Sequence, residues 1–195
     1  MSTHIDNYRT AGGVEIVRET EALSLEQPLA ALLEKLNTHR GAVFSSGYEY
    51  PGRYSRWDIG FVDPPLELVA RQRDFIFRAL NARGKVLLET LRRGLQGHRH
   101  LIELELAGGE LVGTVAPMPA YFPEEERSKQ PTIFSVMRAL VAQMQAEGER
   151  HLGFYGSMGY DLVFQFEPID LRHERREDQP DLHLFLPDEL IVVDH

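Results

Sequence analysis

The chain has 195 residues and a mass of 22.3 kDa, which is enough for one domain with a hydrophobic core. Apolar residues make up 43% and charged residues 26%, so the composition excludes a wholly disordered chain. The 30 Asp and Glu side chains outnumber 21 Lys and Arg, and the net charge of −9 argues against a general affinity for nucleic acid or an anionic membrane.

Cysteine is absent, which rules out disulfide frameworks, thiolate metal sites and cysteine nucleophiles. The polar segment Met1–Arg9 is not followed by the apolar stretch of a signal peptide, and no segment approaches the ~18 apolar residues of a membrane span. We therefore expect a soluble, cytoplasmic protein without a membrane partner.

Hydrophobic periodicity predicts the elements that follow a polar N-terminus (1–12), which we expect to fray and be flexible. The predicted strands are Gly13–Arg18, Ala42–Phe44, Trp57–Val62, Leu66–Ala70, Asp74–Leu80, Leu101–Ala107, Glu110–Val115, Leu182–Leu186 and Glu189–Val193. The predicted helices are one that begins with a capping box at Ser24 and Gln27 and ends at Gly41, one around Val86–Leu95 closed by Gly97, and one from Thr132 to Gly148.

Hairpins outnumber strand–helix–strand units in this pattern. Gly108 and Gly109 accept the positive φ of a tight turn, and a last hairpin is expected around Pro187 and Asp188. The sequence therefore predicts one α+β domain over 13–195, with a mostly antiparallel sheet and covering helices. The apolar strand Glu189–Val193 would form an open sheet edge, a template for a partner or for self-pairing.

Ser45–Arg56 interrupts the strands with Gly47, Pro51 and Gly52, which indicates a loop. The loop contains three tyrosines, two arginines and several hydroxyl groups. Hydroxyls and loop amides bind carboxylate or ammonium groups, and a guanidinium group clamps a carboxylate. Two interpretations stay open from the residues alone, namely a small-molecule site and a structural loop whose tyrosines pack on the core.

Other polar clusters predict no catalytic or metal site. Gly153–Gly159 matches no phosphate-binding motif, so its glycines indicate close backbone packing. His98 and His100 could face the same side of a strand, but the arginines around them favour a solvated patch over a metal site. Glu124–Glu126 and Arg172–Asp178 are expected to be charged surface segments, and no serine, histidine and carboxylate set or carboxylate pair stands out for catalysis.

Three stretches resemble anthranilate synthase component I. They are Phe44-Ser45-Ser46 followed by Gly52-Arg53-Tyr54-Ser55, then Gly159-Tyr160-Asp161-Leu162-Val163 with Phe166-Glu167, and finally Pro180-Asp181-Leu182 running to Val193-Asp194-His195. Their order and approximate spacing agree with the family from about Gly13 to His195. The loop sequence looks most like bacterial enzymes in which component I is fused to its glutamine amidotransferase.

The resemblance implies the N-terminal half of the component I architecture, from an enzyme of the first committed step of tryptophan synthesis. That lyase converts chorismate and glutamine into anthranilate, pyruvate and glutamate with the help of Mg²⁺. The chorismate-binding domain, which holds the Mg²⁺, and the glutamine amidotransferase domain would be partners outside this chain. The chain is therefore expected to be inactive alone and to hold no cofactor.

The resemblance also implies half of a feedback site for L-tryptophan. The implied effector-binding residues are Ser45, Ser46, Arg53, Tyr54 and Ser55. Ser46 matches the serine that touches the inhibitor, whereas Ser45 replaces the family's usual glutamate. The ammonium group of tryptophan would then need Glu49 or a residue from the missing half.

Two alternatives remain open. The first is the N-terminal domain of another chorismate-using aminase, of the aminodeoxychorismate or phenazine type, which would have a different effector or none. The second is a free-standing module without enzymatic activity that binds or assembles with a separate catalytic chain. Because the missing half is expected to cover apolar surface of this chain, self-pairing of the isolated domain into a homo-oligomer is also expected.

Overall fold

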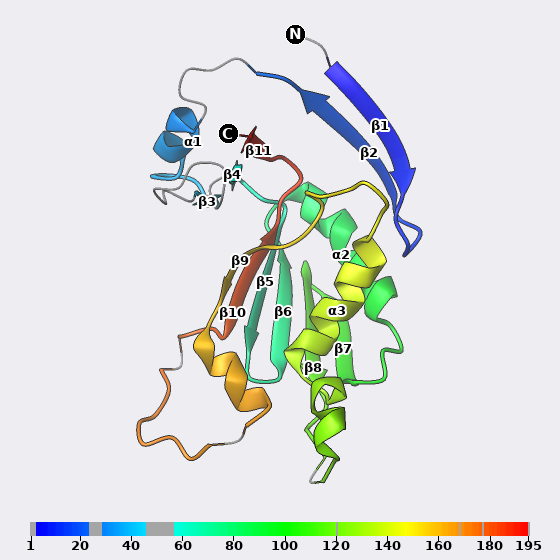
Figure 1. The fold of residues 1–195 in the computed structure, drawn as a ribbon, viewed down its shortest axis with the longest axis vertical. Helices are drawn as coiled ribbons and strands as arrows, with labels where there is room; N and C mark the ends of the chain where they lie inside the picture. The colour runs from blue at the N-terminus through cyan, green and yellow to red at the C-terminus, as the bar shows by residue number, and fades with distance from the viewer. Residues whose placement is uncertain are drawn as a thin grey trace.

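The computed structural model describes residues 3–23, 29–45, 57–119, 121–167, 169–176 and 178–194. Its centre is a six-stranded antiparallel sheet with the order β7-β8-β6-β5-β10-β9, and two helices lie against one face (Figure 1). The elements are β5 (Leu66–Arg71), β6 (Asp74–Ala79), α2 (Ala82–Leu95), β7 (Leu101–Ala107), β8 (Glu110–Val115), α3 (Ile133–Met144), β9 (Tyr155–Met158) and β10 (Leu182–Leu186). The predicted α+β class with mostly antiparallel sheet is confirmed.

The hydrophobic core lies between this sheet and the two helices. Strand register places Leu184, Leu68, Phe77 and Leu111 in one row across four strands, and each of these side chains is buried. Opposed residues of antiparallel strands point to the same face, so the row forms a continuous apolar layer. The helices contribute buried residues at helical spacing, namely Leu88, Leu91, Leu95, Ile133, Val136 and Leu140.

A second, three-stranded sheet has the order β11-β4-β3, with β3 at Gly41–Phe44, β4 at Trp57–Val62 and β11 at Ile191–Asp194. The short helix α1 (Ala30–Lys35) buries Leu32 beside it. The prediction that Gly41 ends this helix is wrong, because the helix stops at Lys35 and Gly41 begins β3. A Cβ at Gly41 would lie 2.2 Å from the carbonyl oxygen of Phe61, so the close approach of β3 to β4 requires glycine. The predicted capping box at Ser24 lies outside the described residues.

The predicted hairpin around Pro187 and Asp188 is also wrong. β10 pairs with β5 and β9, whereas β11 pairs with β4 in the other sheet. The short connection therefore carries the chain from one sheet to the other, and Arg83 holds Asp188 through an ion pair of 2.6 Å. β11 lies at the edge of its sheet, as predicted.

The N-terminus forms a strand, contrary to the expectation that it frays. β1 (Thr3–Arg9) and β2 (Glu15–Glu21) make a two-stranded hairpin that stands apart from both sheets (Figure 1). Its turn docks on the end of α3, where the backbone N–H of Gly12 donates to the carbonyl oxygen of Gln143 at 2.9 Å. Hydrophobic periodicity did not predict this hairpin, because specific polar contacts anchor it and few apolar side chains are buried in it.

Glu149 is the main side-chain anchor of the hairpin. Its carboxylate accepts hydrogen bonds from the Tyr8 hydroxyl at 2.6 Å, from Arg18 at 3.0 Å, and from the backbone N–H groups of His151 and Leu152. Burial favours the neutral acid, but these hydrogen bonds outweigh it and lower the pKa of Glu149 to about 2. Burial and the hydrogen bond to Glu149 raise the pKa of Tyr8 to about 12.

Two short 3₁₀ helices, η1 (Glu124–Lys129) and η2 (Tyr160–Gln165), lie at the opposite end of the six-stranded sheet from the three-stranded sheet (Figure 1). The acidic run Glu124–Glu126 forms the first turn of η1, in agreement with its prediction as a charged surface segment. Among the described residues, no helix combines the length and the apolar character needed to cross a bilayer.

The variant Glu149→Gln tests the anchor. The pKa of Glu149 lies below its ordinary value of 4.5, so the carboxylate contributes stability that is complete above about pH 4.5 and is lost as the pH falls toward about 2. We expect the variant to lower the free energy of unfolding by about 2 kcal/mol at pH 7, and the difference from the wild type to shrink below pH 4.5. Urea unfolding at several pH values measures both quantities.

The exposed neighbour Glu147 provides the matched control. Glu147→Gln should change the free energy of unfolding by no more than about 0.5 kcal/mol at any of these pH values. A pH-independent difference for Glu149→Gln would contradict the assignment.

Candidate functional site

The candidate site lies where the three-stranded sheet packs on the open face of the six-stranded sheet. Four aromatic rings meet there: the Phe61 ring lies 6.1 Å from Tyr155 and 5.9 Å from Phe185, and Phe44 lies 6.1 Å from Tyr155. Phe44 and Phe61 come from β3 and β4, and Tyr155 and Phe185 from β9 and β10. We call these four residues the aromatic cluster; their rings join the two sheets through edge and tilted contacts.

A buried carboxylate lies in the same interface. The Glu67 side chain is only 8% exposed and makes a 2.7 Å contact with His183 Nε2. Arg40 lies 3.4 Å away, just before β3, and Arg78 lies 3.8 Å away on β6. Glu67 therefore connects three strands of the large sheet to the start of the small one.

The ends of the predicted loop are fixed by the small sheet. Phe44 pairs with Ile59 in the register of β3 and β4, so the chain leaves β3 and returns to β4 at the same end of the sheet. Trp57, the first residue of β4, pairs with Asp194 of β11 and meets the His151 ring edge-on at 6.2 Å. The loop thus begins and ends beside Phe44, a member of the aromatic cluster.

Of the predicted effector-binding residues, Ser45 is the one that the structure describes. It is exposed and directly follows β3. Ser46, Arg53, Tyr54 and Ser55 lie outside the described residues, so their prediction remains untested.

The Gly159–Val163 motif has a structural role. The N–H of Gly159 donates to the carbonyl oxygen of Asp181 at 2.7 Å, and Leu162 is buried in the core. Gln165, at the end of the same 3₁₀ helix, accepts a 2.7 Å hydrogen bond from the N–H of Ile133 at the start of α3. The motif and the rest of its 3₁₀ helix thus fix the start of α3 to the sheet.

The prediction of close backbone packing at Gly153–Gly159 is confirmed at Gly156. A Cβ there would lie 2.2 Å from the carbonyl oxygen of His183 on the neighbouring strand.

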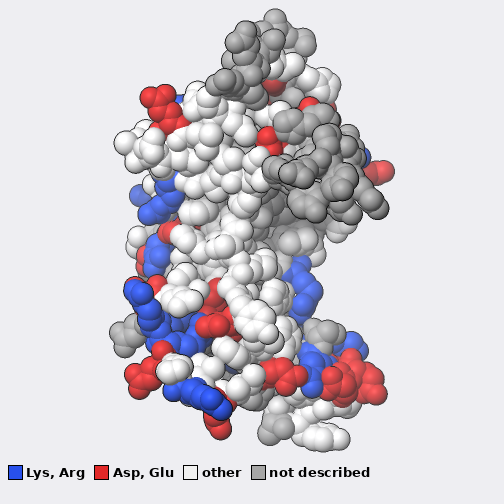
Figure 2. All heavy atoms as spheres, turned by 60° about the vertical axis from the view of Figure 1, so that its left-hand side comes forward, with Lys and Arg blue, Asp and Glu red and all other residues white. Residues whose placement is uncertain are grey.

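The charged run Arg172–Asp178 is not uniformly solvated. Arg175 is only 14% exposed and bridges Asp161 and the buried Asp181, which also accepts a hydrogen bond from the N–H of Gln72. Its neighbour Arg176 is 78% exposed and fits the predicted surface role. Figure 2 shows that charged side chains gather toward the end of the molecule that carries η1 and η2, while the middle of this face is largely uncharged.

His98 and His100 lie in the turn before β7 and are half-buried, so they do not form one face of a strand. Across the described ranges, no three His, Asp or Glu side chains gather closely enough to hold a metal ion. The described residues therefore offer no ligand cluster for the Mg²⁺ that the resemblance implies for the whole enzyme.

Comparison with known proteins confirms the resemblance. The chain is 45% identical over 187 residues to an anthranilate synthase of Azospirillum brasilense, a match that covers 96% of this chain and 25% of that protein. It is 25% identical over 150 residues to a pyocyanine-specific anthranilate synthase component 1 of Pseudomonas aeruginosa, covering 76% of this chain and 27% of that protein. No protein-family model matches the chain. The chain therefore matches a partial region of a larger protein and spans about a quarter of the length of these relatives.

Sequence reasoning missed Glu67 and its partners. Glu67 alternates with Leu66 and Leu68, and such alternation is typical of a residue that faces solvent. The second sheet covers this position, which no local pattern reveals. The sequence offered one signal for this site. The predicted strands Leu66–Ala70 and Leu182–Leu186, each identified by its apolar residues, contain a carboxylate, Glu67, and an imidazole, His183.

The variant Glu67→Gln tests whether this carboxylate holds the two sheets together. A neutral amide would leave Arg40, Arg78 and His183 without their shared counter-charge, so we expect the free energy of unfolding to fall by about 1–3 kcal/mol. Chemical denaturation measures the change. In addition, NMR signals of Phe61 should shift, because the small sheet is held less firmly.

Glu110→Gln is the matched control. Glu110 also pairs with Arg78, at 2.9 Å, but its side chain is 44% exposed. Exposed ion pairs contribute little, so we expect a change of no more than about 0.5 kcal/mol. Equal effects of the two variants would count against a special role for Glu67.

Proposed function

We propose that this chain is the tryptophan-responsive N-terminal domain of an anthranilate synthase component I. The observation that carries the proposal is the 45% identity to an anthranilate synthase over 96% of the chain. The parent enzyme would convert chorismate and glutamine into anthranilate, pyruvate and glutamate in the cytoplasm. The chorismate-binding and glutamine amidotransferase domains would be its partners, and this chain alone would be inactive.

The order of the matching motifs supports this function over the alternatives. All three motifs occur in the family's order, and the similarity to the Azospirillum protein runs through nearly the whole chain. The pyocyanine-specific relative matches less of the chain and at 25% identity. An anthranilate synthase of the tryptophan pathway is therefore favoured over one that serves the pyocyanine pathway.

The geometry beside the loop is suited to an indole ring. The loop ends adjoin the aromatic cluster, where Phe44 is 38% exposed and tilted against Tyr155. Aromatic rings stack on or meet an indole edge-on, and hydroxyls such as Ser45 and Ser46 can bind its amino-acid group. The Arg53 guanidinium would clamp the carboxylate of tryptophan.

Such a site regulates through domain arrangement. Tryptophan held between this domain and the chorismate-binding domain would favour the arrangement in which both halves of the pocket meet. Tryptophan would inhibit the enzyme because it binds this arrangement of the domains more tightly than others, without contact with the reacting atoms.

A direct consequence concerns the isolated chain. With half of the pocket missing, it should bind L-tryptophan with a Kd no tighter than about 1 mM, because only part of the contacts can form. Isothermal titration calorimetry measures this affinity. Low-micromolar binding would contradict the proposal that the site is shared.

Ser46→Ala tests the effector site in an active enzyme. The test protein is the Azospirillum brasilense anthranilate synthase with its matching quarter replaced by this chain. Loss of the hydroxyl should raise the tryptophan concentration for half inhibition about tenfold, while the uninhibited kcat/KM stays within about twofold. Thr20→Ala, on the exposed hairpin strand β2, is the control and should leave both values unchanged. Unaltered inhibition of the Ser46 variant would argue against this residue as a contact.

A further inference from the structure

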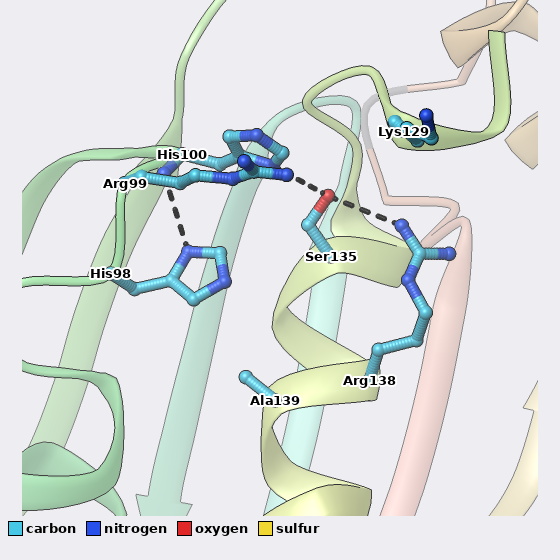
Figure 3. Close-up of a pocket in the computed structure, with 7 residues that line it drawn as sticks. All are labelled: His98, Arg99, His100, Lys129, Ser135, Arg138 and Ala139. Carbon is cyan, nitrogen blue, oxygen red and sulfur yellow. Dashed lines mark hydrogen bonds between the residues drawn. The ribbon is translucent and has the colours of Figure 1, made fainter. Parts of the chain in front are cut away.

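A basic hollow of about 300 Å³ lies on the helix-covered side of the molecule. Its residues are far in sequence from the loop Ser45–Arg56. Its lining comes from three segments: the turn before β7, the end of η1 and the first turns of α3 (Figure 3). The described residues that line it are His98, Arg99, His100, Lys129, Ser135, Arg138 and Ala139. We call this feature the basic hollow.

The polar groups of the basic hollow are suited to an anion. Arg99, Lys129 and Arg138 carry positive charge, and none of the described lining residues is acidic. Lys129 shares its charge with Glu126 at 2.7 Å, outside the lining. In a chain with a net charge of −9, this local excess of cations is the reverse of the overall balance.

The histidines are oriented within this hollow. The Nδ1 atom of His98 accepts a 3.3 Å hydrogen bond from the backbone N–H of His100, which leaves the proton of a neutral His98 on Nε2. The Nδ1 atom of His100 lies 3.0 Å from Ser135 Oγ, which also accepts from the N–H of Thr132. The buried Ser135 thus fixes the His100 ring beside the helix (Figure 3).

We propose that the basic hollow binds a small, doubly charged oxyanion such as a phosphate ester or a dicarboxylate. Two guanidinium groups from different segments can hold two negative oxygens, and His98 Nε2–H adds a neutral donor. The volume admits a phosphoryl group with a few attached atoms. None of the described residues that line this site belongs to the tryptophan loop, and its test does not depend on the proposed function.

Electrostatics within the hollow make the histidines reporters of binding. Burial lowers the pKa of His98, and the positive charges of Arg99 and Arg138 lower it further. Burial, the same two arginines and His98 lower the pKa of His100. A bound dianion offsets the arginine repulsion and raises both values, so binding strengthens as the pH falls through them. Lys129 is a further charged residue that lines the hollow, and it is paired with Glu126.

NMR of the imidazole groups in the whole chain tests the proposal. Titration with inorganic phosphate at pH 7 and constant ionic strength should give saturable shifts of His98 and His100, with a Kd on the order of 1 mM. Succinate in place of phosphate distinguishes a dicarboxylate ligand from a phosphorylated one, and either response supports an oxyanion site. A sulfate titration between pH 5.5 and 8 should show tighter binding at lower pH, because sulfate keeps its charge in this range.

Matched arginine variants separate a site from general charge attraction. Arg99→Gln and Arg138→Gln should each weaken phosphate binding at least about fivefold. Arg93→Gln removes the same charge from an exposed position on α2 outside the hollow and should leave the Kd within about twofold. The proposal is overturned if neither phosphate nor succinate shifts the two histidines up to about 50 mM, or if Arg93→Gln weakens binding as much as the other two.

Discussion

The contact between the two sheets is the constraint on which the candidate site depends. Glu67 links β5 to Arg78 on β6, to His183 on β10 and to Arg40 at the entry to β3. A carboxylate buried to this extent is costly unless its charge is matched, so the contact with Arg40 favours the position of the small sheet that brings this residue to Glu67. The aromatic cluster adds non-directional burial to this directional contact. Together they place the end of the small sheet, and with it both ends of the loop.

Much of the fold follows from local sequence. Gly108 and Gly109, both at positive φ, gave the β7–β8 hairpin, and the apolar stripe from Ile133 onward gave α3. The predictions failed where the partner of a strand lies far away in the sequence. β10 and β11 looked like a hairpin because Pro187 and Asp188 resemble a turn, but their partners are β5, β9 and β4, which no short pattern identifies.

The two sites differ in how far the sequence could predict them. The loop is one continuous segment of the chain, so its glycines, tyrosines and arginines are sufficient to predict it. The resemblance then assigns roles to Ser45 and Ser46. The basic hollow gathers a turn, a 3₁₀ helix and the start of α3, whose residues lie up to 41 positions apart, from His98 to Ala139. In the sequence, the arginines around the two histidines were interpreted as unfavourable for a metal cation. The positive charges that repel a metal cation attract an anion, and the structure adds the charge of Arg138 to the same hollow.

A tryptophan site divided between two domains, as we propose, would have a function of its own. A ligand shifts an arrangement of domains only if its affinity differs between arrangements, and equal affinity shifts nothing however tight the binding. A pocket contained wholly within this domain would bind tryptophan equally in each arrangement. A pocket divided between the loop beside Phe44 and the rest of the parent enzyme would lose half of its contacts whenever the domains separate. The described residues that line the basic hollow all come from this domain, so a ligand held by them alone would stabilise the domain without favouring either arrangement.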